Sequence, residues 1–259
     1  MFYINADRLK RKFKNYQIFE NNYSLSGFTL AETLITLVIV GIIAALTVPS
    51  LINRVQTEQT ISQLNSTYTV FSQALKMAEL HNGKVDTWDI GTQDTSAGAK
   101  KLYDYITPEI KKMKDCSNTS VCFGENYKNL QGGNYQYSLS TSGVYGRGIL
   151  ANGVSFITWS GGSGCNLNHS KTNSGSLFRS CGVIRVDING ARKPNRAGYD
   201  LFDFIITRDG LIPAGTSDFK PMYQNDCKYS STKGANGIDC TAWVLYKKNM
   251  DYKNKNVTW

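Results

Sequence analysis

One apolar run near the N-terminus constrains the fold of this chain more than any other feature. Residues 28–52 read FTLAETLITLVIVGIIAALTVPSLI and hold a single charged side chain, Glu32. As a helix rising 1.5 Å per residue, the run is long enough to cross a hydrocarbon layer of about 30 Å. A carboxylate inside such a helix costs roughly 2.5–3.5 kcal/mol, so it needs a partner or a role. The run therefore predicts a membrane-spanning helix with a functional acid in its first turn.

The helical pattern does not stop where the apolar run ends. Apolar residues recur at steps of three and four over residues 52–78, and Asn82-Gly83 provides a C-terminal stop. We expect one helix over residues 28–80, apolar all round in its first part and amphipathic in its second part. Pro49 interrupts it, which predicts either a kink or local unwinding.

The remainder of the chain changes from a polar, irregular pattern to a strand-like one. A short helix is expected at residues 100–106. Strands are expected at residues 135–139, 149–150, 154–159, 183–188, 201–207 and 241–246, with Asn152-Gly153 as a hairpin turn. We therefore predict an α+β fold, in which the amphipathic half of the long N-terminal helix packs on an antiparallel β-sheet head.

The residues around the start of the apolar run form a specific pattern. A Gly27-Phe28 junction is followed by Thr29, Leu30 and Glu32, and the 27 residues up to the junction carry five basic and two acidic side chains. The pattern resembles the processing site of type IV prepilins and type II secretion pseudopilins. The resemblance implies that a membrane-embedded prepilin peptidase cleaves after Gly27 and that Phe28, the new N-terminal residue, is methylated.

The same resemblance implies roles for three residues of the run. Glu32 becomes the fifth residue of the mature chain and neutralises the terminal amine of a neighbouring subunit in a filament. Two local alternatives remain open: Glu32 pairs with its own N-terminus, or it lies at a helix start where the dipole favours an acid. Gly41 and Pro49 stand where the family usually has a helix-loosening glycine and proline. The implied division is a leader at 1–27, a transmembrane and assembly helix at 28–52, its amphipathic continuation at 53–83 and a globular head at 84–259.

Charge and cysteine content indicate where the head resides. Basic residues ahead of a span stay in the cytoplasm, so the head is expected outside the inner membrane. Six cysteines fit an oxidising compartment and are expected to form disulfides. Among fifteen connectivities we choose sequential pairing: Cys116 with Cys122, Cys165 with Cys181, and Cys227 with Cys240. The last pair resembles the C-terminal disulfide loop of many type IV pilins.

An ordinary secretory signal is the main alternative for the N-terminal region. Residues 34–46 would then be its apolar core, and cleavage near Ser50 would release the head. The region around Ser50 lacks a clean small-x-small cleavage site, and the pattern from Gly27 to Glu32 would be a coincidence.

The segment 187–204 is a candidate calcium site. Asp187, Asn189, Asp200 and Asp203 offer the hard oxygen ligands that Ca²⁺ prefers. The segment resembles the β-region loop of type II secretion pseudopilins, some of which bind calcium there. The alternative is that these side chains cap turns, and the three basic residues of the segment count against a metal.

Motifs of enzymatic chemistry are weak in this sequence. The glycine-rich residues 161–164 lack the Lys-Ser/Thr of a phosphate loop. His169 lies near Ser170 and Cys165, but no positioned acid and no nucleophile elbow is evident. We expect His169 to lie in a surface loop and the chain not to be an enzyme. Lys and Arg are scattered, which favours a solvated basic surface over a specific nucleic-acid site.

These patterns together predict a structural subunit of a type II secretion pseudopilus or a related type IV filament. Its expected partners are other copies of itself or related subunits, the prepilin peptidase, an inner-membrane assembly platform with a separate ATPase motor, and membrane lipid. Two alternatives stay open. One is a pilin of a type IV or DNA-uptake pilus, and the other is a single-span anchored binding or adhesin domain that never assembles.

Overall fold

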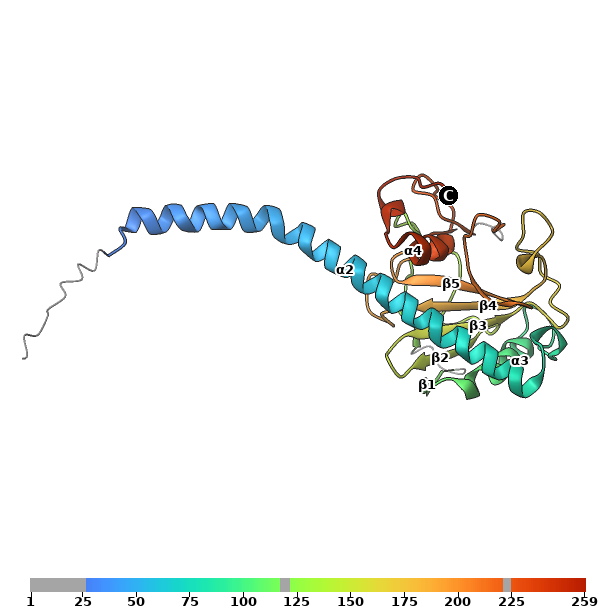
Figure 1. Ribbon diagram of the computed structural model, residues 1–259. Coiled ribbons are helices and arrows are strands. Elements are labelled where there is room, and N and C mark those ends of the chain that lie inside the picture. Colours follow the sequence, from blue (N-terminus) through green and yellow to red (C-terminus); the bar gives the residue numbers. More distant parts are fainter. Residues whose placement is uncertain (1–26, 117–121, 221–224) are drawn as a thin grey trace, which may run out of the picture. The chain divides into compact units, whose positions relative to one another are not determined.

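The computed structural model describes residues 27–116, 122–220 and 225–259 of the chain (Figure 1). The chain divides into two compact units, Met1–Leu51 and Ile52–Trp259. The first unit contributes the start of a long helix, and the second holds the rest of that helix together with the sheet.

The long helix α2 spans Leu30–Asn82 without a break. This confirms the expectation of one helix that continues past the apolar run. Gly83 follows with a φ of +78°, a left-handed conformation that ends helices and that glycine adopts without a Cβ penalty. The helical assignment continues through Pro49, so the local unwinding considered from the sequence is absent from residues 30–82.

The second unit is built on an antiparallel sheet of six strands that follow one another in chain order. The strands are β1 Lys112–Asp115, β2 Gly146–Leu150, β3 Ser155–Ser160, β4 Ser180–Asp187, β5 Leu201–Thr207 and β6 Gly210–Pro213. A separate parallel pair is formed by β7 Asn225–Asp226 and β8 Ala235–Asn236. The predicted α+β arrangement, with a helix packed on an antiparallel sheet, is confirmed.

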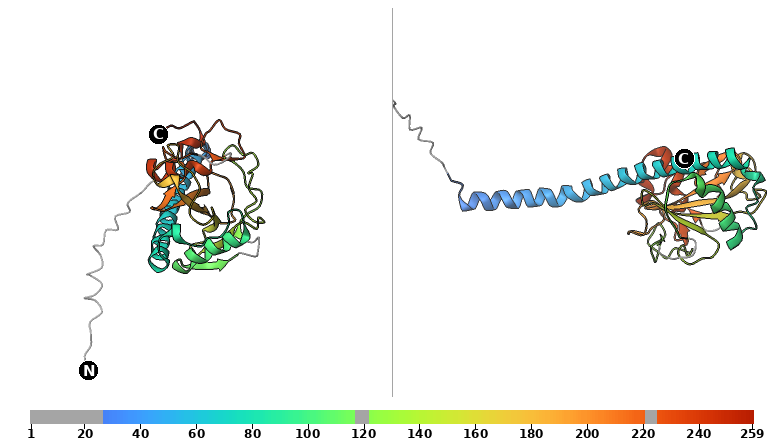
Figure 2. Two further views of the ribbon diagram at one scale, coloured as in Figure 1. Left: turned by 90° about the vertical axis from the view of Figure 1, so that its right-hand side faces the viewer. Right: turned by 90° about the horizontal axis from the view of Figure 1, so that it is seen from below.

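The head half of α2 packs on one face of this sheet (Figures 1 and 2). Phe71 is fully buried and meets Phe156 of β3 edge-on, with ring centroids 5.2 Å apart. Tyr68 lies 5.5 Å from the ring of Phe204 on β5 and donates its hydroxyl to the carbonyl of Leu211. Apolar side chains at every second strand position meet apolar side chains at helical spacing, and this match forms the main core.

Loops cover the opposite face of the sheet and form two smaller apolar clusters. Ile157 and Leu201 pack with tyrosines of the segment before β2, and Val183 and Ile205 pack with Phe219. This face also buries charged side chains. Among the described residues, the face covered by α2 buries none.

Two short α-helices and several 3₁₀ turns complete the head. Helix α3, Ser96–Ile106, contains the predicted short helix and begins at Thr95, whose hydroxyl accepts the amide N–H of Gly98. Helix α4 spans Thr241–Lys247. The 3₁₀ turns are Val85–Thr87, Thr107–Glu109, Ser176–Phe178, Ile238–Cys240 and Asp251–Lys253.

The strand predictions are right in the centre of the sheet and wrong at its periphery. The hairpin around Asn152-Gly153 forms between β2 and β3, with Gly153 at a φ of +88°. Residues 135–139, however, are not a strand; they lie over the sheet as an irregular segment. Residues 241–246 are helical, because Thr241, Ala242, Val244 and Leu245 are buried at helical rather than alternating spacing. Strands β1 and β6 were not predicted, since both are short edge strands with little alternation.

Candidate functional site

The first candidate site is the start of α2, where the sequence predicts processing. Thr29 precedes the helix and Glu32 lies in its first turn. The Glu32 carboxylate accepts the amide N–H of Thr29 at 2.9 Å and its hydroxyl at 3.0 Å, and the amide of Glu32 donates to the Thr29 hydroxyl at 3.2 Å. This reciprocal arrangement is a capping box, which satisfies amide groups that the helix leaves without a partner. The local alternative for Glu32, a role at the helix start, is therefore present in the single chain.

Gly27, Phe28, Gly41 and Pro49 lie on the exposed surface of the first unit. A Cβ added at Gly27 or at Gly41 would meet no described atom within 4 Å. Packing among the described residues therefore does not require glycine at either position.

The span half of α2, residues 30–51, presents its apolar side chains outward. Leu37, for example, is 70% exposed, and the same holds for its apolar neighbours along the helix. The helix is long and apolar enough to cross a membrane, which agrees with a single-pass membrane protein.

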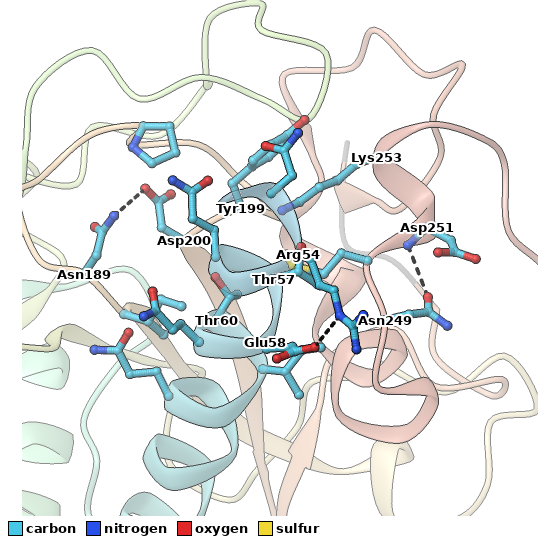
Figure 3. Close-up of a pocket in the computed structure, with 18 of the residues that line it drawn as sticks. Arg54, Thr57, Glu58, Thr60, Asn189, Tyr199, Asp200, Asn249, Asp251 and Lys253 are labelled. Carbon is cyan, nitrogen blue, oxygen red and sulfur yellow. Dashed lines mark hydrogen bonds and ion pairs between the residues drawn. The ribbon is translucent and has the colours of Figure 1, made fainter. Parts of the chain in front are cut away.

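The second candidate site is a polar groove of about 900 Å³ in the head unit (Figure 3). One wall is the first part of the head half of α2, from Asn53 to Gln63. The other walls are the β4–β5 loop, which includes Arg192 and Lys193, and the C-terminal segment from Lys248 onward. We refer to this feature as the basic groove, because five of its lining residues are Lys or Arg and three are acidic.

Asp187, Asn189 and Asp200, three of the predicted calcium ligands, meet at the β4–β5 loop. The Asn189 amide donates to Asp200 at 3.3 Å (Figure 3). The backbone N–H of Asn189 donates to Asp187 at 3.3 Å. The two oxygens of Asp200 also accept the backbone N–H groups of Asn195 at 2.7 Å and Arg196 at 2.6 Å. The side chains therefore brace the loop from inside, as the turn-capping alternative expects.

Asp203, the fourth predicted ligand, does not join them. It lies on the opposite face of the sheet from α2, directly across from Arg185 on the neighbouring strand. Both Asp203 oxygens accept hydrogen bonds from the Arg185 guanidinium, at 2.7 and 2.8 Å, and both side chains are buried. This is a two-point ion pair, in which each charge compensates the cost of burying the other.

Burial shifts the titration of the loop carboxyls. Desolvation raises the pKa of Asp200 to about 6, although backbone N–H donors oppose the shift. Desolvation and the nearby Asp200 charge raise the pKa of Asp187 well above its ordinary value, and the Tyr127 hydroxyl donates to Asp187. Both carboxyls therefore bind a proton more readily than an exposed aspartate does.

The predicted calcium ligand set is thus divided between two places. Asp203 belongs to Arg185, and Asp200 has backbone donors on both oxygens. Within the described residues, no group of three or more His, Cys, Asp or Glu side chains is arranged to hold a metal ion. The four residues do not fit a calcium ion as a single set.

The cysteines are paired in sequence order in the structure. Disulfides join Cys116 to Cys122, Cys165 to Cys181, and Cys227 to Cys240. This is the connectivity chosen from the sequence. All three pairs belong to the head unit, and the second ties the loop after β3 to the start of β4.

Two functional-looking features escaped the sequence reasoning. His169, expected in a surface loop, is only 1% exposed; it stacks on Phe219 and contacts the Ser180 hydroxyl at 2.5 Å. Burial lowers the pKa of His169 to about 4. The buried Arg185–Asp203 pair was also missed, because the alternation of β4 and β5 indicates one apolar face and does not report what covers the other.

A second, smaller pocket lies at the far end of α2. There Lys101 pairs with Asp89, His81 contacts Glu109 at 2.9 Å, and Asp104 also lines the pocket. Acidic residues outnumber basic ones at this end, in contrast to the basic groove.

Comparisons with protein-family models, with curated proteins and with solved structures find no match to this chain. The functional assignment therefore depends on the residues and geometry described above.

Proposed function

We propose that this chain is a structural subunit of a filament of the type IV pilin class, in the branch of the type II secretion pseudopilins. The observation that carries the proposal is the two-part helix α2. Its first half exposes a continuous apolar surface with one acid in the first turn, and its second half is the spine of the head. A side-by-side bundle of such helices buries the apolar halves and leaves the heads outside.

Processing would change the environment of Glu32. Cleavage between Gly27 and Phe28 would create an amine one residue before Thr29, whose own backbone N–H already lies 2.9 Å from the Glu32 carboxylate. The carboxylate is therefore placed close to the new positive charge. In a bundle core of low dielectric, two opposite charges stabilise each other, whereas either one alone is costly. A pair formed between neighbouring subunits would favour one packing register.

The proposal includes a localisation and a set of partners. The basic leader would remain in the cytoplasm, and the head would lie beyond the inner membrane. Prepilin peptidase would process the chain, and an assembly platform driven by a separate ATPase would extract it from lipid. We expect no catalytic activity from the chain itself. In the secretion branch, loss of the protein would block exoprotein release, whereas in a type IV or DNA-uptake pilus it would block motility or transformation.

Removal of the prepilin peptidase tests the proposal directly. The chain is expressed with and without the peptidase, and its mass and N-terminus are measured by mass spectrometry. We expect a chain that begins at methylated Phe28 only when the peptidase is present. The variant Gly27→Leu provides the matched control, since it should stay uncleaved in both strains. An intact leader in the presence of the peptidase, or a chain that begins near Ser50, would contradict the proposal.

One observation favours a second function, that of an anchored extracytoplasmic binding domain. The capping box satisfies Glu32 within a single chain, so this acid has a local role without any neighbouring subunit. The second function predicts a retained leader and a monomer in the membrane. Crosslinking of the membrane-embedded chain separates the two functions, because only a filament subunit would give a ladder of oligomers.

A further inference from the structure

The basic groove begins where the membrane span ends. Its α2 wall starts at Asn53, two residues after Leu51, the last residue of the first unit. At a rise of 1.5 Å per residue, the helix from Asn53 to Glu58 covers roughly 3–10 Å beyond Leu51. The polar headgroup layer on each side of a bilayer is about 5–8 Å thick. The first turn of the groove wall therefore lies at headgroup depth when residues 28–52 span the membrane.

The acids that line the groove are already engaged. Glu58 pairs with Arg54 at 3.0 Å on the same helix (Figure 3), and Asp251 pairs with Lys255 at 3.3 Å. Asp200 accepts backbone N–H groups of the β4–β5 loop. Among the described residues, the lining acids form no ion pair with the other basic side chains of the groove, although the charge of Asp200 acts on Lys253 from beyond ion-pair distance.

Four cations remain at the groove once these pairs are set aside: Arg192, Lys193, Lys248 and Lys253. Across residues 27–116, 122–220 and 225–259, no ion pair neutralises any of them. Arg192 and Lys193 come from the β4–β5 loop, and Lys248 follows α4, so segments distant in sequence bring the charges together. Like charges at one site repel one another, and an anion between them removes that repulsion.

Lys253 is the least exposed of the four cations. Its ammonium nitrogen lies 4.1 Å from the centroid of the Tyr199 ring, on which the Arg196 guanidinium also rests at 4.3 Å. Burial lowers the pKa of Lys253 to about 8; the nearby Asp200 carboxylate opposes this shift, and the nearby Arg196 adds to it. An anion in the groove would offset this cost of burying a positive charge.

From the position of Asn53 just after the span in the chain, and from this charge, we infer that the basic groove binds the phosphate of an anionic phospholipid headgroup at the membrane surface. Ammonium and guanidinium groups form strong charge-assisted hydrogen bonds with phosphate. The amide of Asn53 lines the same groove and suits the hydroxyls of a glycerol headgroup. The pocket at the opposite end of α2 is instead lined by three acidic residues and one lysine, Lys101. The inference depends on the membrane span alone, and not on cleavage or filament assembly.

Native mass spectrometry of the full chain released from nanodiscs tests the inference. The probes are nanodiscs of phosphatidylcholine alone and of phosphatidylcholine mixed with phosphatidylglycerol. We expect phosphatidylglycerol to be retained in preference to phosphatidylcholine. The double variant Lys193→Gln/Lys248→Asn should weaken that retention by about fivefold per lysine, or roughly 25-fold in total. Asparagine is chosen at position 248 because Lys248 has a φ of +54°.

The control variant Lys76→Gln/Lys111→Gln removes two exposed lysines outside the groove. It should retain phosphatidylglycerol as the wild type does, and thermal melting verifies that both double variants are folded. Equal retention of the two lipids, or an equal loss in both variants, would overturn the inference. Displacement of phosphatidylglycerol by inorganic phosphate would also overturn it, because the site would then bind free anions.

A second copy of the chain is the competing source of an anion. If the groove variant loses self-association in neutral nanodiscs while its phosphatidylglycerol retention is unchanged, the groove binds carboxylates of another subunit and the lipid inference is wrong. Failure of the lipid inference leaves the processing test of the proposed function unaffected, since that test reads only the N-terminus.

Discussion

The two halves of α2 share one continuous backbone and differ in everything their side chains meet. In residues 30–51 apolar side chains such as Leu37 point outward, whereas in residues 52–82 Leu64, Phe71 and Leu75 are buried in the head. A helix satisfies its own backbone hydrogen bonds wherever it lies, but an apolar surface needs a second molecule or a second element. The head half therefore buries its apolar side chains within this chain, whereas the span half leaves its apolar side chains exposed.

The largest predicted effect on filament yield comes from replacing an acidic residue in each half of α2. Glu32→Gln in the span half should abolish filament formation while leaving cleavage after Gly27 largely intact, because the buried terminal amine loses its counter-charge. The same substitution in the head half, Glu58→Gln, removes only an exposed pair with Arg54 and should leave filament yield unchanged. Filament yield by electron microscopy and N-terminal mass spectrometry provide the two readouts. Normal filaments from the Glu32 variant would disprove the intersubunit role.

The next effect is a difference between the two halves of α2 in how much a truncated side chain lowers the free energy of unfolding. Phe71→Ala should lower the free energy of unfolding of the head by about 3–5 kcal/mol, because it leaves a cavity against Phe156. Leu37→Ala in the span half should change it by less than about 0.5 kcal/mol. Both are measured on the full chain in detergent by denaturant unfolding followed through tryptophan fluorescence. Equal losses would mean that the span half contributes to the folded head.

A smaller effect concerns pH and lies wholly in the head. The pKa of His169 is about 4 in the folded chain, below the ordinary value of 6.5, so folding favours the neutral ring. Its contribution to stability is full above pH 6.5 and is lost as the pH falls towards 4, by roughly 2–3 kcal/mol at pH 4.5. Asp200, whose pKa is raised to about 6, acts in the opposite direction: its protonation favours the folded state as the pH falls.

The variant His169→Gln isolates the histidine contribution. Denaturant unfolding is measured at pH 7 and at pH 4.5 for both proteins, and the carboxyl effects cancel in the difference between them. The wild type should lose more stability between the two pH values than the variant does. Identical losses would show that the pKa of His169 is the same in the folded and the unfolded chain.

The smallest effect tests the helix start. Thr29→Ala removes the hydroxyl that accepts the Glu32 amide and should weaken the first turn of α2 by about 1 kcal/mol. Faster hydrogen exchange at residues 30–33 in detergent is the measurement. Thr36→Ala, which removes only a hydroxyl bonded to a carbonyl of its own helix, is the control. Exchange at wild-type rates in the Thr29 variant would mean that the capping box contributes little to the helix start.

Sequence reasoning succeeded where a local pattern decides the structure. The residues around Asn152-Gly153 need a positive φ at the turn, and the hairpin between β2 and β3 forms there. The prediction was wrong where only packing decides between the helical period of 3.6 residues and the strand period of two. Residues 241–246 form a short apolar run that fits either a strand or a helix, and burial of Val244 and Leu245 selects the helix α4.

The same division runs through the candidate sites. The asymmetry of α2, from an exposed apolar half with Glu32 to a buried amphipathic half, is determined by the sequence alone, because composition and a period of 3.6 residues are properties of one continuous segment. Tertiary contacts alone place Asp203 against Arg185 and away from the loop that holds Asp200, the other predicted calcium ligand. They also bring four cations from separate segments to one groove. Such contacts join residues far apart in the chain, and their partners depend on strand register and loop path, which no local pattern encodes.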